Sequence, residues 1–389
     1  MVYFFCTFFH TCVIMWPLSE RTIKMKHIFH KKPYIKQNKL VNSIIDEASI
    51  FFDIETTGFS PATSMVYLIG CLRKQGDEWI IDQFLAKNKE DEKEILNQFV
   101  DLLSQYDTII TFNGIGFDIP FIKAKCVSYG ISCCFDSFQY VDIFKEVGKL
   151  KSILNLPNFK QKTIEQFLGI TREDIYSGGE LIPMFEKYIS THDPYTEELL
   201  LLHNYEDVLG MLDLIPILSY PKLLSGSFRI KSSEISSFTA YDGNEGTELI
   251  FTLENDYILP KRVSFQCSNY FCIMNQNETK IRVPIYDGEL KYFYENYKDY
   301  YYLPEEDMAI HKSVATFVDK EYRQKAKACN CYTRKAGRFL PQFYAFLTPA
   351  FRANHKDKVS YFEITKDFLS NDIALRDYIK HIFDHAIKN

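Results

Sequence analysis

The chain has 389 residues, of which 46% are hydrophobic and 25% charged, as expected for a globular protein of about two domains. Its formal net charge is −6, so binding to nucleic acid would need local basic segments or bound metal rather than a global attraction. Its 10 cysteines lack the spacing of a disulfide framework, which excludes a secreted disulfide scaffold and favours reduced thiols in the cytoplasm.

The first residues of the chain differ from the rest in composition. Residues 1–18 contain no Asp, Glu, Lys or Arg, whereas a signal peptide would begin with a basic segment. The run is also at the lower length limit for a membrane span. We favour an upstream extension of the reading frame for residues 1–24; a membrane anchor or a helix packed on the domain are the alternatives. Residues 25–48 are basic and polar and form a lead-in.

A buried strand is predicted at residues 49–54, and it ends next to two carboxylates. Apolar residues at positions 50, 52 and 54 fall on one face, whereas Asp53 and Glu55 fall on the other face together with Phe51. Two like charges side by side repel each other unless a counter-charge is present, and a divalent cation is the usual one. We therefore interpret Asp53 and Glu55 as candidate metal ligands.

The next segments predict a mixed sheet. Apolar runs at 65–73 and 79–85 are expected to be antiparallel neighbours of the first strand. A helix at 90–105 then leads to a strand at 108–112, and a strand–helix–strand crossover favours parallel pairing.

A glycine-containing turn, Asn113-Gly114-Ile115-Gly116, follows that strand, and a helix is predicted from about residue 117. Asp118 lies in its first turn, where an acid is also explained by the helix dipole. A fifth strand ends at about Asp142. Further helices are expected at the following positions: 162–168, 181–190 and 194–218.

The last of these helices carries His203 and Asp207. They are four residues apart and share a helix face. A simple local contact between the two side chains is the alternative to a functional pair.

Beyond residue 221 short alternating runs predict a β-meander. The expected runs are 248–253, 262–267, 270–274, 280–285 and 289–294, with the last turn at Asp287-Gly288. Helices are expected at 308–328 and 370–387. The segment Lys320–Phe339 combines basic and aromatic residues, which suits a groove for single-stranded nucleic acid, with a solvated helix face as the alternative.

Taken together, four acids from three separated segments suggest one site. Asp53, Glu55, Asp118 and Asp207 can surround two divalent cations that clamp a scissile phosphate. Carboxylate oxygens suit Mg²⁺ or Mn²⁺ better than zinc.

These motifs make residues 49–218 resemble the ribonuclease H-like, DnaQ-type (DEDD) 3′-to-5′ exonuclease superfamily, most closely the YprB-like predicted exonucleases. Phe52-Asp53-Ile54-Glu55-Thr56-Thr57-Gly58 is similar to the first exonuclease motif, and Asn113 to Asp118 to the second. The third motif is Tyr-x-x-x-Asp or His-x-x-x-x-Asp in these enzymes. Here His203 and Asp207 have the spacing of the tyrosine class with histidine in its place.

The resemblance implies roles for these residues. The four acids would bind the two metals, and His203 would orient or deprotonate the attacking water. Glu55 would also contact the terminal 3′-hydroxyl. Thr56 and Phe117 would wedge the terminal base, Lys162 would approach a phosphate, and Asp142 would lie just behind the site. Core packing (Phe117), a solvated surface position (Lys162) and a structural role (Asp142) are the alternatives.

The expected protein is thus an α/β nuclease. We predict a ribonuclease H-like mixed five-stranded sheet flanked by helices over 49–220, preceded by residues 1–48 and followed by a smaller α+β domain over 221–389. The implied function is a metal-dependent 3′-to-5′ exonuclease acting on 3′ ends of single-stranded DNA or RNA, with two Mg²⁺ or Mn²⁺ ions and no organic cofactor, in the cytoplasm and not on a membrane. A nucleic-acid-binding module of the same fold with weak or lost catalysis is the alternative.

Overall fold

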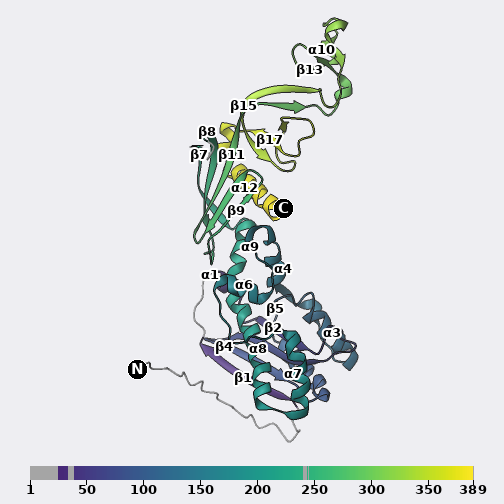
Figure 1. Ribbon diagram of the computed structural model, residues 1–389, viewed down its shortest axis with the longest axis vertical. Helices are drawn as coiled ribbons and strands as arrows, with labels where there is room; N and C mark the ends of the chain where they lie inside the picture. Colours follow the sequence, from purple (N-terminus) through teal and green to yellow (C-terminus); the bar gives the residue numbers. More distant parts are fainter. Residues whose placement is uncertain (1–24, 34–38, 240–242, 244, 389) are drawn as a thin grey trace, which may run out of the picture. The chain divides into compact units, whose positions relative to one another are not determined.

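The computed structural model describes residues 25–33, 39–239, 243 and 245–388. The interpretations of residues 1–24 fall outside this part of the chain. Within it, no helix has both the length and the apolar character needed to cross a membrane. Contacts divide the chain into two compact units (Figure 1). The first takes in the described residues up to Lys149 and Leu156–Leu218, and the second takes in Leu150–Asn155 and everything from Ser219 onward.

The first unit is built on a mixed sheet of six strands in the order β1-β4-β3-β2-β5-β6. The strands are β1 (Lys26–Pro33), β2 (Ser49–Thr56), β3 (Val66–Gln75), β4 (Glu78–Leu85), β5 (Thr108–Thr111) and β6 (Gln139–Asp142). The pairs β1–β4, β4–β3 and β3–β2 are antiparallel, whereas β5 pairs parallel with β2 and with β6. The predicted mixed α/β sheet is therefore confirmed, but the expected number of five strands was too low. The sixth strand is β1, which comes from the polar lead-in. It lies at the edge of the sheet and pairs only with β4.

Helices cover both faces of this sheet. They are α1 (Lys39–Ile44), α2 (Glu92–Leu103), α3 (Asp118–Tyr129), α4 (Ile143–Gly148), α6 (Gln161–Leu168), α7 (Gly178–Thr191) and α8 (Pro194–Leu214), with short 3₁₀ turns at Lys89–Asp91, Phe135–Ser137 and Ile215–Leu218. α7 begins three residues before the predicted start because Ser177 and Glu180 form a capping box. The predicted 194–218 helix is confirmed as far as Leu214, after which the last turn tightens.

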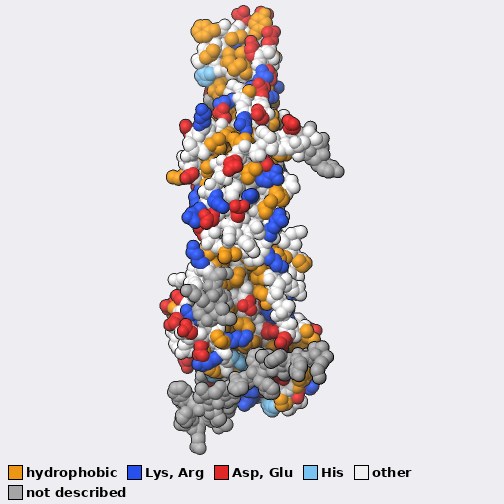
Figure 2. All heavy atoms as spheres, turned by 90° about the vertical axis from the view of Figure 1, so that its left-hand side faces the viewer, with side chains coloured by type: hydrophobic (Ala, Val, Ile, Leu, Met, Phe, Trp, Pro, Cys, Tyr) orange, Lys and Arg blue, Asp and Glu red, His pale blue; other side chains and the backbone are white. Residues whose placement is uncertain are grey.

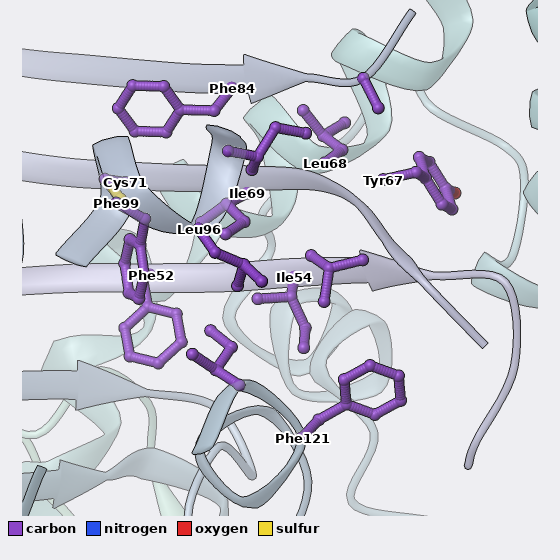
Figure 3. Close-up of a cluster of buried hydrophobic side chains, with 14 of the residues drawn as sticks. Phe52, Ile54, Tyr67, Leu68, Ile69, Cys71, Phe84, Leu96, Phe99 and Phe121 are labelled. Atoms are coloured by element: carbon purple, nitrogen blue, oxygen red, sulfur yellow. The ribbon is translucent and has the colours of Figure 1, made fainter. Parts of the chain in front are cut away.

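The alternation along β2 decides what each face of the strand contacts. Phe52 and Ile54 point into the cluster of buried side chains in Figure 3, together with Phe99 of α2 and Phe121 of α3. The rings of Phe52 and Phe99 lie 5.0 Å apart, and both side chains are buried. Asp53 and Glu55 project from the opposite face, on the side of α8. One strand thus anchors the core and presents the two acids.

The second unit is mostly antiparallel sheet. Its main strands are β7 (Phe228–Thr239), β8 (Glu245–Asn255), β9 (Val263–Cys267), β10 (Tyr270–Asn275), β11 (Glu278–Phe293), β15 (Tyr332–Gln342), β16 (Phe351–Arg352) and β17 (Ser360–Glu363). Two predicted runs, 280–285 and 289–294, are one continuous strand. The expected turn at Asp287-Gly288 is wrong, because these residues pair with Arg338 and Gly337 of β15. Gly288 has a φ of 153°, which only glycine adopts easily, so the strand passes through it without turning.

The predicted helix at 308–328 is also wrong. Its residues form β13 (Met308–His311), the four-residue helix α10 (Lys312–Ala315), a 3₁₀ turn at Lys320–Tyr322 and β14 (Gln324–Lys325). Both strands pair with β12 (Tyr300–Leu303) in a small separate sheet. Pairing with the tyrosine-rich strand β12, which directly precedes β13 in a hairpin, overrides the local helical spacing. The predicted helix at 370–387 is confirmed as α12 (Asp372–Lys388), after the short α11 (Lys366–Leu369).

Candidate metal centre

The five candidate residues come from three elements of the first unit. Asp53 and Glu55 lie on β2, Asp118 is the first residue of α3, and His203 and Asp207 lie on α8. Glu55, Asp118 and His203 are buried, whereas Asp53 and Asp207 are partly exposed. The structure places all five at one side of β2.

The loop after β5 brings Asp118 to β2. Asp142 fixes this loop, because its carboxylate accepts hydrogen bonds from the backbone N–H groups of Asn113 at 3.0 Å and Ile115 at 3.2 Å. At position 114 a Cβ would lie 2.6 Å from the Thr111 side chain, so the turn needs glycine there. Asp118 Oδ1 then accepts a hydrogen bond from the Ile54 N–H at 3.2 Å. Its carboxylate therefore contacts the strand between Asp53 and Glu55.

A close contact with β3 and β4 positions α8. Asn204 Nδ2 donates to Asp53 Oδ2 at 3.3 Å, and its Oδ1 accepts from Gln83 Nε2 at 3.0 Å. Gly70 makes this approach possible, because a Cβ there would lie 2.1 Å from Asn204 Oδ1. Asn204 is fully buried. It was not singled out from the sequence, although it lies between the two predicted residues of the helix.

His203 lies between two of the candidate acids. Its Nε2 is 3.1 Å from Asp207 Oδ2 and 3.5 Å from Glu55 Oε1. One ligand atom from each of these three residues lies within 4.8 Å of the other two. The i,i+4 spacing predicted that His203 and Asp207 share a face, and this is confirmed. Tyr205 faces the other way, with its ring against His30 of β1.

Burial and mutual repulsion perturb the acids strongly. Burial raises the pKa of Asp53 well above its usual range, and the charges of Asp118, Asp207 and Glu55 raise it further. Burial is also the main cause that raises the pKa of Glu55 to about 8 and that of Asp118 to about 7. Acids in this state are poorly compensated by the protein, and a divalent cation would compensate them.

Asp207 and His203 show the opposite balance. Burial opposes the charged form of each, but their mutual hydrogen bond and the opposite charges around them together outweigh it. The pKa of Asp207 is therefore lowered, and the pKa of His203 is raised to about 9. Arg172 contributes to the low pKa of Asp207, since its guanidinium pairs with Asp207 Oδ1 as well as with Glu165.

The loop between α6 and α7 supplies a partner for the second ring nitrogen of His203, Nδ1. Asp174 Oδ2 lies 2.7 Å from His203 Nδ1, and Lys162 Nζ lies 2.7 Å from the same oxygen. Glu206 holds the loop by accepting from the backbone N–H of Asp174 at 2.9 Å. Asp174 was not predicted from the sequence. No spacing pattern connects it to His203, because the contact depends on how the loop folds against α8.

Several secondary expectations receive a structural answer. Lys162 binds Asp174 and the carbonyl of Tyr176, which accounts for its charge without a phosphate. The Thr56 hydroxyl donates to the Gly58 carbonyl at 2.9 Å. Phe117 packs against Phe121 and against Phe59, which is 91% exposed. The predicted alternative for Phe117, core packing, therefore describes much of its surroundings.

The basic segment at 320–339 is not a free cationic stripe. Arg334 lies 3.3 Å from Glu289, Lys335 lies 2.5 Å from Glu363, and Arg338 lies 4.0 Å from Asp287. On the face drawn in Figure 2, Lys/Arg and Asp/Glu side chains are interspersed in the same way. Acids on neighbouring strands thus offset the charges of Arg334, Lys335 and Arg338.

The donor set suits a hard or borderline divalent cation. Four carboxylates could supply oxygen ligands, and His203 could add an imidazole nitrogen. Three of the carboxyl groups have raised pKa values, which a nearby positive charge would lower. The residues present therefore fit a divalent metal centre.

Comparisons with known proteins agree with the fold. Residues 50–219 match a family model described as the RNase H superfamily. A segment of 42 residues is 43% identical to a DNA polymerase of Methanocaldococcus jannaschii and covers 11% of this chain and 3% of that protein. The domain therefore has an RNase H-like fold, and the matched segment is a small part of that much longer polymerase.

Two solved structures are similar to the chain at lower sequence identity. The family B DNA polymerase of the archaeon Pyrobaculum calidifontis is 16% identical with a TM-score of 0.36, over 45% of this chain and 26% of that one. Exonuclease I of E. coli, solved in complex with a dT13 oligonucleotide, is 13% identical with a TM-score of 0.27, over 53% of this chain and 55% of that one. The chain thus spans about a quarter to a half of these proteins.

Proposed function

We propose that the protein is a metal-dependent 3′-to-5′ exonuclease that hydrolyses phosphodiester bonds of single-stranded DNA or RNA. The observation that carries the proposal is the convergence of Asp53, Glu55, Asp118 and Asp207 around one side of β2, with three of their pKa values raised. Such a site is costly for the fold unless it binds cations. The matched superfamily and the resemblance of the motifs support a nuclease as the reason for it.

The chain's own residues would divide the work as follows. The four carboxylates would hold two Mg²⁺ or Mn²⁺ ions, and these would supply positive charge to the scissile phosphate and activate a water. Asn204 and the Ile54 N–H orient Asp53 and Asp118. Arg172 pairs with Oδ1 of Asp207, and Oδ2, which contacts His203 Nε2, is the oxygen that faces the site. His203 acts at the same site through Nε2, whether on the attacking water or on a metal.

The proposal is tested with Asp53→Asn in the full chain. Removing one ligand charge should lower cleavage of a labelled single-stranded oligonucleotide by at least about 1000-fold in Mn²⁺ or Mg²⁺, equivalent to about 4 kcal/mol of barrier. Asp101→Asn, at an exposed position of α2, is the matched control and should cleave normally. Unchanged cleavage in Asp53→Asn would refute the two-metal site.

The direction of attack and the nature of the substrate need separate arms. DNA and RNA strands with a blocked 3′ end should resist degradation, and strands with a blocked 5′ end should not. Degradation of both in equal measure would point to an endonuclease. We also propose, from the resemblance of the three sequence motifs, that the protein is a DnaQ-type exonuclease similar to the YprB-like family.

The second candidate is a nucleic-acid-binding module with weak catalysis. The ion pair between Arg172 and Asp207 favours it, because a cationic side chain already neutralises one candidate ligand. Metal binding measured by calorimetry, together with strand binding but no cleavage by wild-type protein, would support this alternative.

The domain division and the location of the protein remain proposals. We propose an exonuclease domain over 49–220 and a separate C-terminal domain over 221–389, in the cytoplasm. Limited proteolysis should cut first in the turn at 225–227, just after the helix α9 (Ser219–Leu224), if the two parts fold independently. Early cuts inside β2 or α8 would contradict this division.

A further inference from the structure

The position of His203 suggests a different role from that of a general base. A base must reach a water molecule through a free ring nitrogen. His203 is only 4% exposed, and its Nε2 lies against Glu55 and Asp207. A cation held by these two carboxylates would therefore lie beside Nε2, where it would compete with a water.

The spacing of the three ligand atoms matches coordination of one ion. Atoms that each lie about 2.1 Å from a metal are about 3.0 Å apart in octahedral geometry and about 3.4 Å apart in tetrahedral geometry. The distances from His203 Nε2 are 3.1 Å to Asp207 Oδ2 and 3.5 Å to Glu55 Oε1. The Glu55 and Asp207 oxygens lie within 4.8 Å of each other, so an approach of these two carboxylates would let all three atoms bind the same ion.

The far side of the ring supplies an independent observation. His203 Nδ1 lies 2.7 Å from Asp174 Oδ2, and Asp174 is itself buried and held by Lys162. Metal-binding histidines nearly always donate their second ring N–H to a carboxylate or carbonyl in this way, which fixes the ring and directs the other nitrogen to the metal. Asp174 thus fixes Nδ1 as a donor and directs Nε2 toward the two carboxylates, where a bound cation would replace the proton that Nε2 shares with Asp207.

We propose that His203 is a metal ligand through Nε2, forming with Glu55 and Asp207 a mixed nitrogen–oxygen site that prefers a first-row transition-metal dication over Mg²⁺. This inference rests on the proposed metal centre but goes beyond it. Imidazole nitrogen adds affinity for transition metals, whereas Mg²⁺ favours oxygen ligands and bound water. Asp174 is the positioning residue of this ligand.

The test uses full-length protein in which only histidine is labelled with ¹⁵N, with Mn²⁺ as the probe. Pulsed electron paramagnetic resonance should detect a hyperfine coupling between Mn²⁺ and an imidazole nitrogen in wild-type protein. The coupling should disappear in His203→Gln and remain in His355→Gln, a control at an exposed histidine of the second unit.

Affinity measurements give a second readout. His203→Gln should weaken Mn²⁺ binding at least about tenfold while changing Mg²⁺ binding by less than about threefold. Asp174→Asn should reduce Mn²⁺ affinity by about tenfold and alter the nitrogen coupling, whereas a purely structural role would weaken both ions equally.

The outcomes separate this inference from the proposed function. Bound Mn²⁺ without nitrogen coupling in wild-type protein that cleaves strands would overturn the ligand role and leave the nuclease standing. Nitrogen coupling without any cleavage would support the ligand role and overturn the nuclease. If His203→Gln does not fold, the presence or absence of the coupling in labelled wild-type protein decides the question.

Discussion

At the scale of single residues, the site is defined by how its charges are compensated. Asp207 is held by His203 and Arg172, and its pKa is low. Glu55 and Asp118 are buried with too little positive charge nearby, and their pKa values rise to about 8 and about 7. The same side of β2 thus contains one acid that the protein stabilises and others that it leaves for a cation.

This imbalance predicts how pH affects the metal-free protein. When the pKa of an acid is higher in the folded than in the unfolded chain, the folded protein becomes less stable as pH rises between these two pKa values. For Glu55 this window runs from 4.5 to about 8, and for Asp118 from 3.8 to about 7. The raised pKa of His203, about 9, acts in the same direction. The free energy of unfolding in chelator should therefore fall between pH 5.5 and pH 8.

Denaturant titrations with and without Mn²⁺ would measure this effect. Mn²⁺ should stabilise the protein more at pH 8 than at pH 5.5, because fewer protons then compete for the ligands. Glu55→Gln should flatten the metal-free pH profile. A metal-free protein that becomes more stable toward pH 8 would contradict the assignment of uncompensated acids.

At the scale of elements, the distance between α8 and β3 sets the site. Asp53 and Gly70 are paired residues of β2 and β3, and Asn204 of α8 lies over both. The missing side chain at Gly70 lets the helix approach until Asn204 contacts Asp53. The helix therefore carries His203 and Asp207 at a depth that depends on one glycine.

A methyl group at this position should disturb both stability and metal binding. In Gly70→Ala the new Cβ would lie 2.1 Å from Asn204 Oδ1 and 2.8 Å from Val208 Cγ2, so α8 must shift. We expect a loss of about 1–3 kcal/mol in the free energy of unfolding and weaker Mn²⁺ binding. Gly148→Ala is the control, since nothing lies within 4 Å of its added Cβ. Equal effects of the two substitutions would show that the close approach is unimportant.

At the scale of the whole molecule, the chain passes between the two units more than once. The short helix α5 (Lys151–Leu154) comes from the middle of the first unit's sequence but belongs to the second unit. There the Ser152 hydroxyl donates to the Ala386 carbonyl at 2.6 Å, and Ile153 and Leu154 are buried. The boundary near residue 220 therefore does not separate the units completely.

This connection predicts the behaviour of a shortened chain. A protein ending at Leu218 should keep its sheet but expose Ile153 and Leu154, so it should bind a hydrophobic dye and associate more than the full chain. Replacing both residues by Asn should reduce dye binding in the shortened protein. A shortened chain that remains monomeric and binds no dye would show that α5 needs no cover.

Local patterns were sufficient for much of the first unit. Alternation along β2, helical spacing in α2 and α8, and the pairing of His203 with Asp207 on one face could be predicted because they depend on neighbours within a few residues. The second unit was predicted less well. The strand β14 and the continuous strand β11 depend on partners about 20 to 50 residues away, which spacing within a short window does not reveal.

The sequence by itself determined which acids could form a site, since strand periodicity and motif spacing place Asp53, Glu55, Asp118 and Asp207 on elements that an α/β sheet brings together. Only the tertiary structure decided how those acids are held and what surrounds them. The contacts of Asn204, Arg172 and Asp174 arise where α8 and the 169–177 loop fold against the sheet. Such contacts join residues remote in the chain, and no local preference specifies them. Among them, the contact with Asp174 fixes the ring of His203 with Nε2 toward Glu55 and Asp207.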